Sequence, residues 1–142
     1  MPVISFADKY TATSKRTERY SDFYTNLNRN IGTRDLARLT DENSIIRAIK
    51  NIVLTRRGER PFFPEFGCNI TGLLFENFNE FTKTAMETEI KTAIENFEPR
   101  ANVIDVVVQE NVDLNQVVAT IYFSAINSTE TTTVSFLLNR IR

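Results

Sequence analysis

The stretch "QVVATIYFSAI", Gln116 to Ile126, alternates between two kinds of side chain along its length. Its odd-numbered members are apolar and would share one face of an extended chain: Val117, Ala119, Ile121, Phe123 and Ala125. The other face carries Val118, Thr120, Tyr122 and Ser124. A period of two is that of a β-strand with one face on a core, so this stretch predicts a half-buried strand.

Two further stretches rich in β-branched and aromatic residues lie on either side of it. These are "ANVIDVVVQ", residues 101–109, and "TTTVSFLLN", residues 131–139. The short polar segments "ENVDLN" and "NSTE" connect the three stretches as turns. Together they predict a three-stranded antiparallel meander with helices on one face.

Helical spacing dominates the region before the meander. "TDENSIIRAIKNIVLTRRG" has an apolar face of Ile45, Ile46, Ile49, Ile52 and Val53; Arg56 and Arg57 fall in its expected last turn, before Gly58. "NEFTKTAMETEIKTAIENFEPR" carries a stripe of Phe81, Met86, Ile90, Ala93, Ile94 and Phe97. "NITGLLFENF" predicts a short helical turn bearing Leu73, Leu74, Phe75 and Phe78. The fold class is therefore α+β, with two main helices packed on a small, mainly antiparallel β-meander and an N-terminal arm.

Residues 1–40 form the predicted arm. Their scattered aromatic residues, Phe6, Tyr10, Tyr20, Phe23 and Tyr24, fit neither a long helix nor a long strand. The arm is either loosely ordered or becomes ordered on a partner through those aromatic side chains. We expect a partner-ordered arm over residues 1–40 and a folded domain over residues 41–142.

The composition limits which partners and which catalytic groups the chain could use. The net charge of the 142 residues is −1, which favours neither nucleic acid nor an anionic membrane as the main partner. Histidine is absent and Cys68 is the single cysteine, so catalysis would depend mainly on carboxylates. We expect no metal and no cofactor. No apolar run approaches the roughly 20 residues of a membrane span, and the N-terminus has no secretory h-region.

A stiff loop, "TRRGERPFFPEFGCN" from Thr55 to Asn69, follows the first helix. Pro61 and Pro64 prevent helix there. The loop is either fastened to the core by its phenylalanine side chains, or it is a recognition surface in which aromatic side chains and arginine contribute most of the binding.

A second motif, "NFEPRA", ends the second helix. Pro99 favours an extended backbone at Glu98, and alternate side chains of an extended chain point the same way. Glu98 and Arg100 are therefore expected to project together, either as a clamp for a partner or as a surface ion pair worth about 0–1 kcal/mol.

Carboxylates suited to glycoside hydrolysis are present by residue type alone: Glu59, Glu65, Glu76 and Glu98. Such catalysis needs two carboxylates across a cleft, and nothing in the sequence indicates one.

The two motifs, followed by the meander, carry a resemblance over roughly residues 40–142. "LTRRGERPFFPEFGCNITGLLFENF" and then "NFEPRA" resemble the baseplate wedge and sheath-initiator family of contractile phage tails, which type VI secretion systems share. Members of this family have been labelled "lysozyme-like". The resemblance implies a structural virion protein and no enzymatic activity.

The resemblance further implies where the protein works and with what. Several copies would surround the tail tube in the baseplate, after assembly in the host cytoplasm. The implied partners are the tail sheath protein and other wedge proteins, with the tail tube as a further candidate. Arms of sheath subunits would add strands to the sheet and so start sheath polymerisation.

The resemblance also assigns residues. Those expected to bind partners are Glu98, Pro99, Arg100, Arg56, Arg57, Arg60 and Glu65. Those expected to build the loop scaffold are Gly58, Pro61, Phe62, Pro64, Phe66 and Gly67, with Phe62 and Phe66 pointing inward. Two alternatives stay open, namely a peptidoglycan-degrading hydrolase and a binding module unrelated to tails.

Overall fold

A computed structural model of the chain describes residues 20–24, 26–111, 114–126, 128 and 130–139. Two compact units divide the chain, Met1–Asp41 and Glu42–Arg142. Phe6 and Tyr10 of the predicted arm lie outside the described residues, as do parts of both predicted turns of the meander.

The first unit contains a small hairpin. Strand β1 (Ser21–Phe23) pairs antiparallel with β2 (Arg38–Thr40), and a single bridge joins Arg29 to Leu36. None of the described side chains of residues 20–40 is buried. Isolated two-stranded hairpins are marginally stable at best in water, so the described part of this unit has little of its own to hold it together.

Three helices of the second unit follow in order: α1 (Asp41–Leu54), α2 (Ile70–Leu74) and α3 (Glu80–Phe97). The predicted apolar face of α1 lies against the core. Helix α3 begins where the side chain of Asn79 accepts a 2.8 Å hydrogen bond from the Thr82 N–H, which satisfies one of the free donors of the first turn.

Some details of the predicted helices were wrong. Helix α1 ends at Leu54, so Arg56 and Arg57 lie beyond its last turn and belong to the loop. Phe81, which was placed in the apolar stripe of the second long helix, is 81% exposed, and Phe75, which was placed in the short helical turn, is 69% exposed. Phe81 lies in the first turn of α3 and Phe75 directly follows the last residue of α2, so both stand at helix ends.

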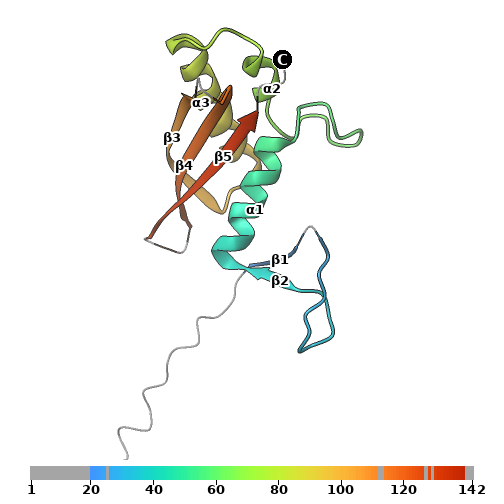
Figure 1. Ribbon diagram of the computed structural model, residues 1–142. Coiled ribbons are helices and arrows are strands. Elements are labelled where there is room, and N and C mark those ends of the chain that lie inside the picture. Colours follow the sequence, from blue (N-terminus) through green and yellow to red (C-terminus); the bar gives the residue numbers. More distant parts are fainter. Residues whose placement is uncertain (1–19, 25, 112–113, 127, 129, 140–142) are drawn as a thin grey trace, which may run out of the picture. The chain divides into compact units, whose positions relative to one another are not determined.

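The meander is confirmed. Strands β3 (Ala101–Asn111), β4 (Gln116–Ala125) and β5 (Thr131–Asn139) form an antiparallel sheet in the order β3-β4-β5 (Figure 1). Burial alternates without interruption along β4, where the odd-numbered residues of the predicted face are buried. An irregularity between Val103 and Asp105 interrupts the register of β3 and leaves Ile104 half exposed.

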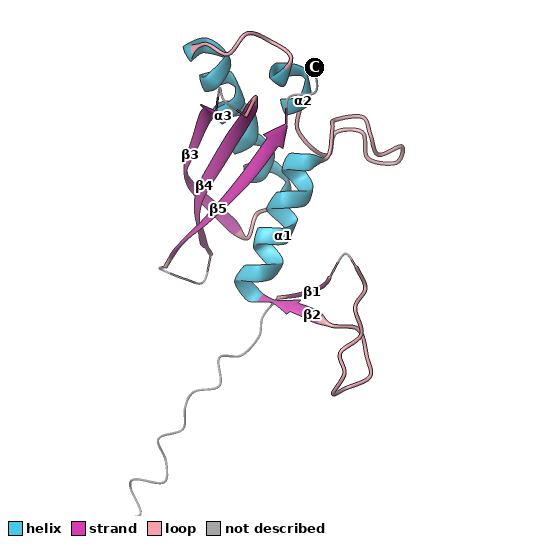
Figure 2. Ribbon diagram, in the orientation of Figure 1, coloured by secondary structure: helices cyan, strands magenta, loops and turns pink. Residues whose placement is uncertain are grey.

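Helices and strands share one core. Figure 2 shows α3 running behind the sheet, and apolar side chains from all three helices join the buried face of β3, β4 and β5 in one cluster. Ile49, Ile90 and Phe123 are completely inaccessible to solvent. The α+β class is thus confirmed. Within the described part of the chain, no helix is both long enough and apolar enough to cross a membrane.

Candidate functional site

The loop after α1 is a chain of hydrogen-bonded turns. Backbone N–H groups of Glu59, Phe63 and Phe66 donate to the carbonyl three residues earlier, at 3.0, 3.1 and 3.1 Å. Pro61 and Pro64 occupy the second position of two of these turns, which their fixed φ favours. Local chemistry therefore sets a defined path for a loop that extends away from the helices and sheet (Figure 1).

Two glycines allow the loop to leave and return. Gly58 has φ +85° at the third position of its turn, where a positive φ is required. Gly67 has φ +104°, and a Cβ there would meet the carbonyl oxygen of Thr55 at 2.3 Å. That close approach lets the Cys68 N–H donate to the same oxygen at 3.0 Å and closes the base of the loop.

Three aromatic rings fasten the loop to α3. The ring of Phe66 lies 5.2 Å from that of Phe97 and 6.0 Å from that of Phe63, centroid to centroid, and the Arg60 guanidinium lies 4.1 Å above Phe66. Such ring and cation–π contacts add to simple burial.

The inward orientation expected for Phe66 is therefore found, but that expected for Phe62 is wrong. Phe62 is completely exposed, because it follows Pro61 at the apex of a turn and has no core residue within reach.

A carboxylate of α3 holds the two ends of the loop. Glu89 Oε1 accepts from Arg57 at 3.0 Å and from the Asn69 N–H at 3.2 Å. Arg57 is thus engaged within the chain. Glu59 is also engaged within the chain, since its carboxylate accepts a hydrogen bond from the Arg56 N–H at 2.9 Å. The side chains of Arg56 and Glu65 are exposed.

The Glu-Pro-Arg motif forms a bidentate pair. Arg100 Nε and Nη2 each donate to one carboxylate oxygen of Glu98 at 2.6 Å, and the Arg100 backbone N–H lies 3.3 Å from Oε1. Both side chains project together, as expected, but the extended chain expected there is wrong: residues 98–101 form a turn in which the Ala101 N–H donates to the Glu98 carbonyl at 3.1 Å and Pro99 holds the second position. Their burial differs, since the side chain of Glu98 is 4% exposed and that of Arg100 is 31% exposed. Glu98 therefore orients Arg100, which is the more exposed member of the pair.

The loop and the motif meet at the end of α3. Phe97 packs its ring against Phe63 and Phe66 of the loop, and Glu98 follows it directly in the chain. The structure therefore joins the two predicted stretches into a single surface, which we call the Phe97 junction and define as residues 56–66 together with 97–100.

Catalytic chemistry finds little support at this surface. Burial raises the pKa of the Cys68 thiol to about 11, so it stays protonated, and its sulfur lies 3.3 Å from the Val53 carbonyl oxygen. Both carboxylate oxygens of Glu98 are occupied by Arg100. Across the described residues, no group of three or more side chains of the kinds that ligate metals comes together.

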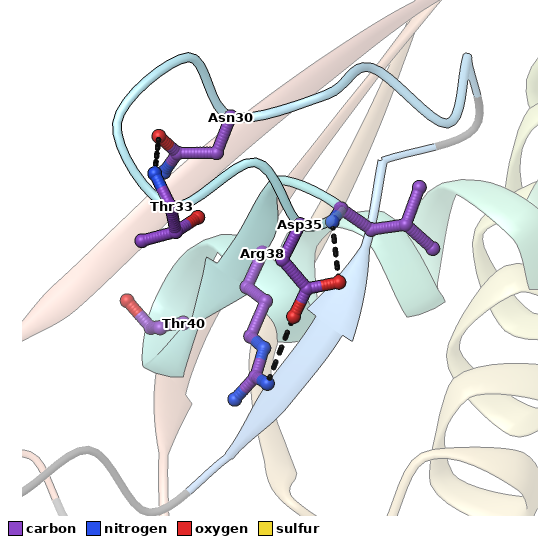
Figure 3. A pocket seen from close by; sticks show the side chains of 6 residues that line it. Asn30, Thr33, Asp35, Arg38 and Thr40 are labelled. Atoms are coloured by element: carbon purple, nitrogen blue, oxygen red, sulfur yellow. Dashed lines mark hydrogen bonds and ion pairs between the residues drawn. The ribbon is translucent and has the colours of Figure 1, made fainter.

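A cavity lies within the hairpin of the first unit (Figure 3). Its lining comprises Asn30, Thr33, Asp35, Leu36, Arg38 and Thr40. The Asp35 carboxylate is 3.8 Å from Arg38 and also accepts from the Leu36 N–H at 2.8 Å. This arrangement supports the turn between the strands, and a single carboxylate paired with arginine is not the catalytic pair that glycoside hydrolysis needs.

Sequence reasoning missed the carboxylates along β3. Glu87 of α3 accepts from the Val108 N–H at 3.0 Å, and Asp105 accepts from the Val106 N–H at 2.9 Å. The signal at Asp105 was a charged residue within an apolar strand. Glu87 gave no signal, because only the packing of α3 beside β3 brings it to the strand.

Comparisons with known proteins agree on the family. The model of the family described as baseplate wedge protein gp25 matches residues 39–129. Baseplate wedge protein gp25 of Enterobacteria phage T4 is 37% identical over 95 residues, which cover 67% of this chain and 72% of that protein.

Solved structures share the fold. A Geobacter sulfurreducens protein named as a candidate tail lysozyme is 25% identical, with a TM-score of 0.67 over 71% of this chain and 92% of that one. A chain of the anti-feeding prophage baseplate is 14% identical, with a TM-score of 0.59 over 87% of both chains. A chain of the type VI secretion system baseplate complex is 18% identical, with a TM-score of 0.55 over 68% of this chain and 92% of that one.

Proposed function

This chain belongs to the baseplate wedge protein gp25 family and is a baseplate component of a contractile tail system, and we propose that it initiates the sheath by accepting strands from sheath subunits. The observation that carries the proposal is the difference between the two edges of its sheet. Strand addition gives a partner a registered and directional contact through backbone hydrogen bonds.

The β3 edge is closed to an added strand. The N–H groups of Val106 and Val108 already donate to carboxylates, and α3 packs beside the strand. The irregularity at Val103 to Asp105 further breaks the regular ladder that a partner strand would need.

The β5 edge is open, and its register identifies the groups it offers. The N–H of Val108 points away from β4, because it donates to Glu87. Ala119, which lies opposite Val108 on β4, therefore directs its own N–H and C=O toward β5. On β5, Ala119 pairs with Phe136. Phe136 then points to β4, so alternate residues such as Thr133 and Ser135 point outward. Both are exposed, and among the described residues no side chain bonds to a backbone N–H of β5.

The remaining contacts are proposed to run through the Phe97 junction. Arg100 and the exposed Arg56, Arg60 and Glu65 are proposed to bind neighbouring wedge proteins, with Glu98 and Pro99 holding Arg100 in place. Arginine held in a bidentate pair is a rigid, planar donor suited to such a joint. The arm is proposed to become ordered on a partner, because its described residues have no buried side chain of their own.

The protein is proposed to act without catalysis, in several copies around the tail tube. The family is named for a place in the baseplate. Both carboxylate oxygens of Glu98 accept hydrogen bonds from Arg100, so Glu98 is not a free acid or base. A hydrolase would instead show cell-wall cleavage by the purified chain that is lost on a single glutamate substitution.

The test removes one outward donor of β5. Thr133→Pro deletes an N–H that faces away from β4, whereas Thr133→Ala keeps the N–H and serves as the matched control. In cells infected with phage carrying each variant, electron microscopy should show baseplates with bare tubes for Thr133→Pro and sheathed tails for Thr133→Ala. Sheathed tails from a folded Thr133→Pro chain would contradict strand addition at β5.

A further inference from the structure

Phe62 is the most exposed aromatic side chain of the second unit among the described residues. Its relative exposure is 102%, compared with 50% for Phe63, and it stands on a loop that extends away from the core. A fully hydrated phenylalanine contributes nothing to the stability of the isolated chain, and large aromatic side chains are the residues that anchor protein interfaces.

The loop holds Phe62 in a fixed place. Pro61 and Phe62 are the two central residues of the turn closed by the 3.1 Å bond from the Phe63 N–H to the Arg60 carbonyl. The Gly58 N–H also reaches the Pro64 carbonyl at 2.8 Å, across the loop. On both sides of the apex, Arg60 and Phe63 are tied to the Phe66 ring, so little further order has to be gained on binding.

We propose that Phe62 is an aromatic anchor that inserts into an apolar pocket of a neighbouring baseplate protein. This inference rests on the proposed role in the baseplate and names the anchoring residue of the Phe97 junction, which is separate from the β5 edge. The pocket takes one phenyl ring and carries a carboxylate at its rim, facing the Arg60 guanidinium.

The charges of the loop favour a carboxylate at the rim of the partner's pocket. Arg56, Arg57 and Arg60 outnumber Glu59 and Glu65. Glu59 is turned toward the Arg56 N–H within the loop, and Arg57 is paired with Glu89 of α3. The charges left for a partner are therefore Arg56 and Arg60 against Glu65, which are mainly cationic. Complementary charge at the rim of an interface fixes its register and speeds its assembly.

A lipid surface fits the Phe62 side chain less well than a protein pocket does. One phenylalanine with the exposed carboxylate of Glu65 three residues away offers too little apolar area for stable membrane binding, which needs two anchoring signals. A protein pocket can enclose the ring from all sides and exclude water from it.

The experiment replaces Phe62 with the photoreactive amino acid p-benzoylphenylalanine in the full-length chain during tail assembly. The same replacement at Phe81, which is 81% exposed on α3, is the matched control. Mass spectrometry should map the Phe62 crosslink to one peptide of one other baseplate protein, and the Phe81 probe should not give that product. Crosslinks confined to lipid or to the chain itself would overturn the proposal.

A second measurement uses Phe62→Ala against Phe81→Ala. Incorporation into purified baseplates should fall about 10- to 100-fold for Phe62→Ala, as for an interface hot spot, at unchanged thermal stability. Wild-type incorporation would refute the anchor. Wild-type incorporation of Phe62→Ala together with bare tubes for Thr133→Pro would refute the anchor but leave the proposed function standing. Sheathed tails from both Phe62→Ala and Thr133→Pro would contradict the proposed function as well.

Discussion

Two irregular regions of this chain look alike in sequence and differ in structure. The loop at residues 55–69 and the hairpin at residues 20–41 are both polar, aromatic and rich in turn residues. The loop is tied to α3 by the rings of Phe63 and Phe66 and by Glu89. The described residues of the hairpin contain no buried side chain.

The difference shows what makes an irregular segment part of a fold. Both regions satisfy their backbone locally, through turns in one and strand pairs in the other. Local hydrogen bonds contribute little net free energy, whereas full burial of a phenylalanine side chain contributes about 1.5–3 kcal/mol, of which the partly buried Phe63 and Phe66 gain a share. The loop is therefore expected to unfold with the core, and the hairpin independently of it.

The largest effect is expected at the base of the loop. Gly67→Ala should lower the free energy of unfolding by roughly 3 kcal/mol or more, because the new Cβ meets the Thr55 carbonyl and the φ of +104° is strained for alanine. Gly58→Ala is the control, since no atom lies within 4 Å of its Cβ position and only the strain of its φ remains, about 1–2 kcal/mol. Urea denaturation measures both, and equal losses would show that the close approach does not matter.

A smaller loss is expected from Arg100→Ala. It leaves the buried Glu98 carboxylate without its bidentate partner, which should cost about 2–4 kcal/mol given that the arginine itself is partly exposed. The double variant Glu98→Gln with Arg100→Ala should recover part of the loss, because a neutral amide is cheaper to bury. Thermal denaturation of the three chains tests this, and no recovery would mean that packing rather than charge dominates.

Cys68 should make stability depend on alkaline pH. Its pKa of about 11 in the folded chain exceeds that of an unfolded cysteine, so the stabilisation is complete below about pH 8.5 and is lost progressively between there and pH 11. Across that interval of about 2.5 pH units the loss is about 3 kcal/mol, at about 1.4 kcal/mol for each unit. Urea denaturation at pH 8 and at pH 10.5, compared with Cys68→Ala, isolates it. A pH dependence equal to that of the variant would show that the thiol does not contribute.

The smallest effect is expected from deleting residues 1–40. Since the described part of this region has no buried side chain, its loss should change the unfolding free energy of the second unit by less than about 1 kcal/mol. Calorimetry of the full and shortened chains measures this, and a much larger loss would show that the arm stabilises the second unit.

Much of the site could be predicted from the sequence, for local reasons. Prolines and glycines determined where the loop turns, and Pro99 placed Glu98 and Arg100 on the same side. The burial of those groups could not be predicted. Phe62 and Phe66 are the same residue type in the same loop, yet only Phe66 faces Phe97.

By itself, the sequence determined the helices and the three strands, because periodicity, β-branching and proline act through neighbours along the chain. Only the tertiary structure decided that α3 brings Glu87 to β3 and Glu89 to the loop, and that β3 and β5 are the two edge strands of the sheet. These outcomes depend on contacts between residues about 20 positions apart or more in the chain, for which no local pattern exists.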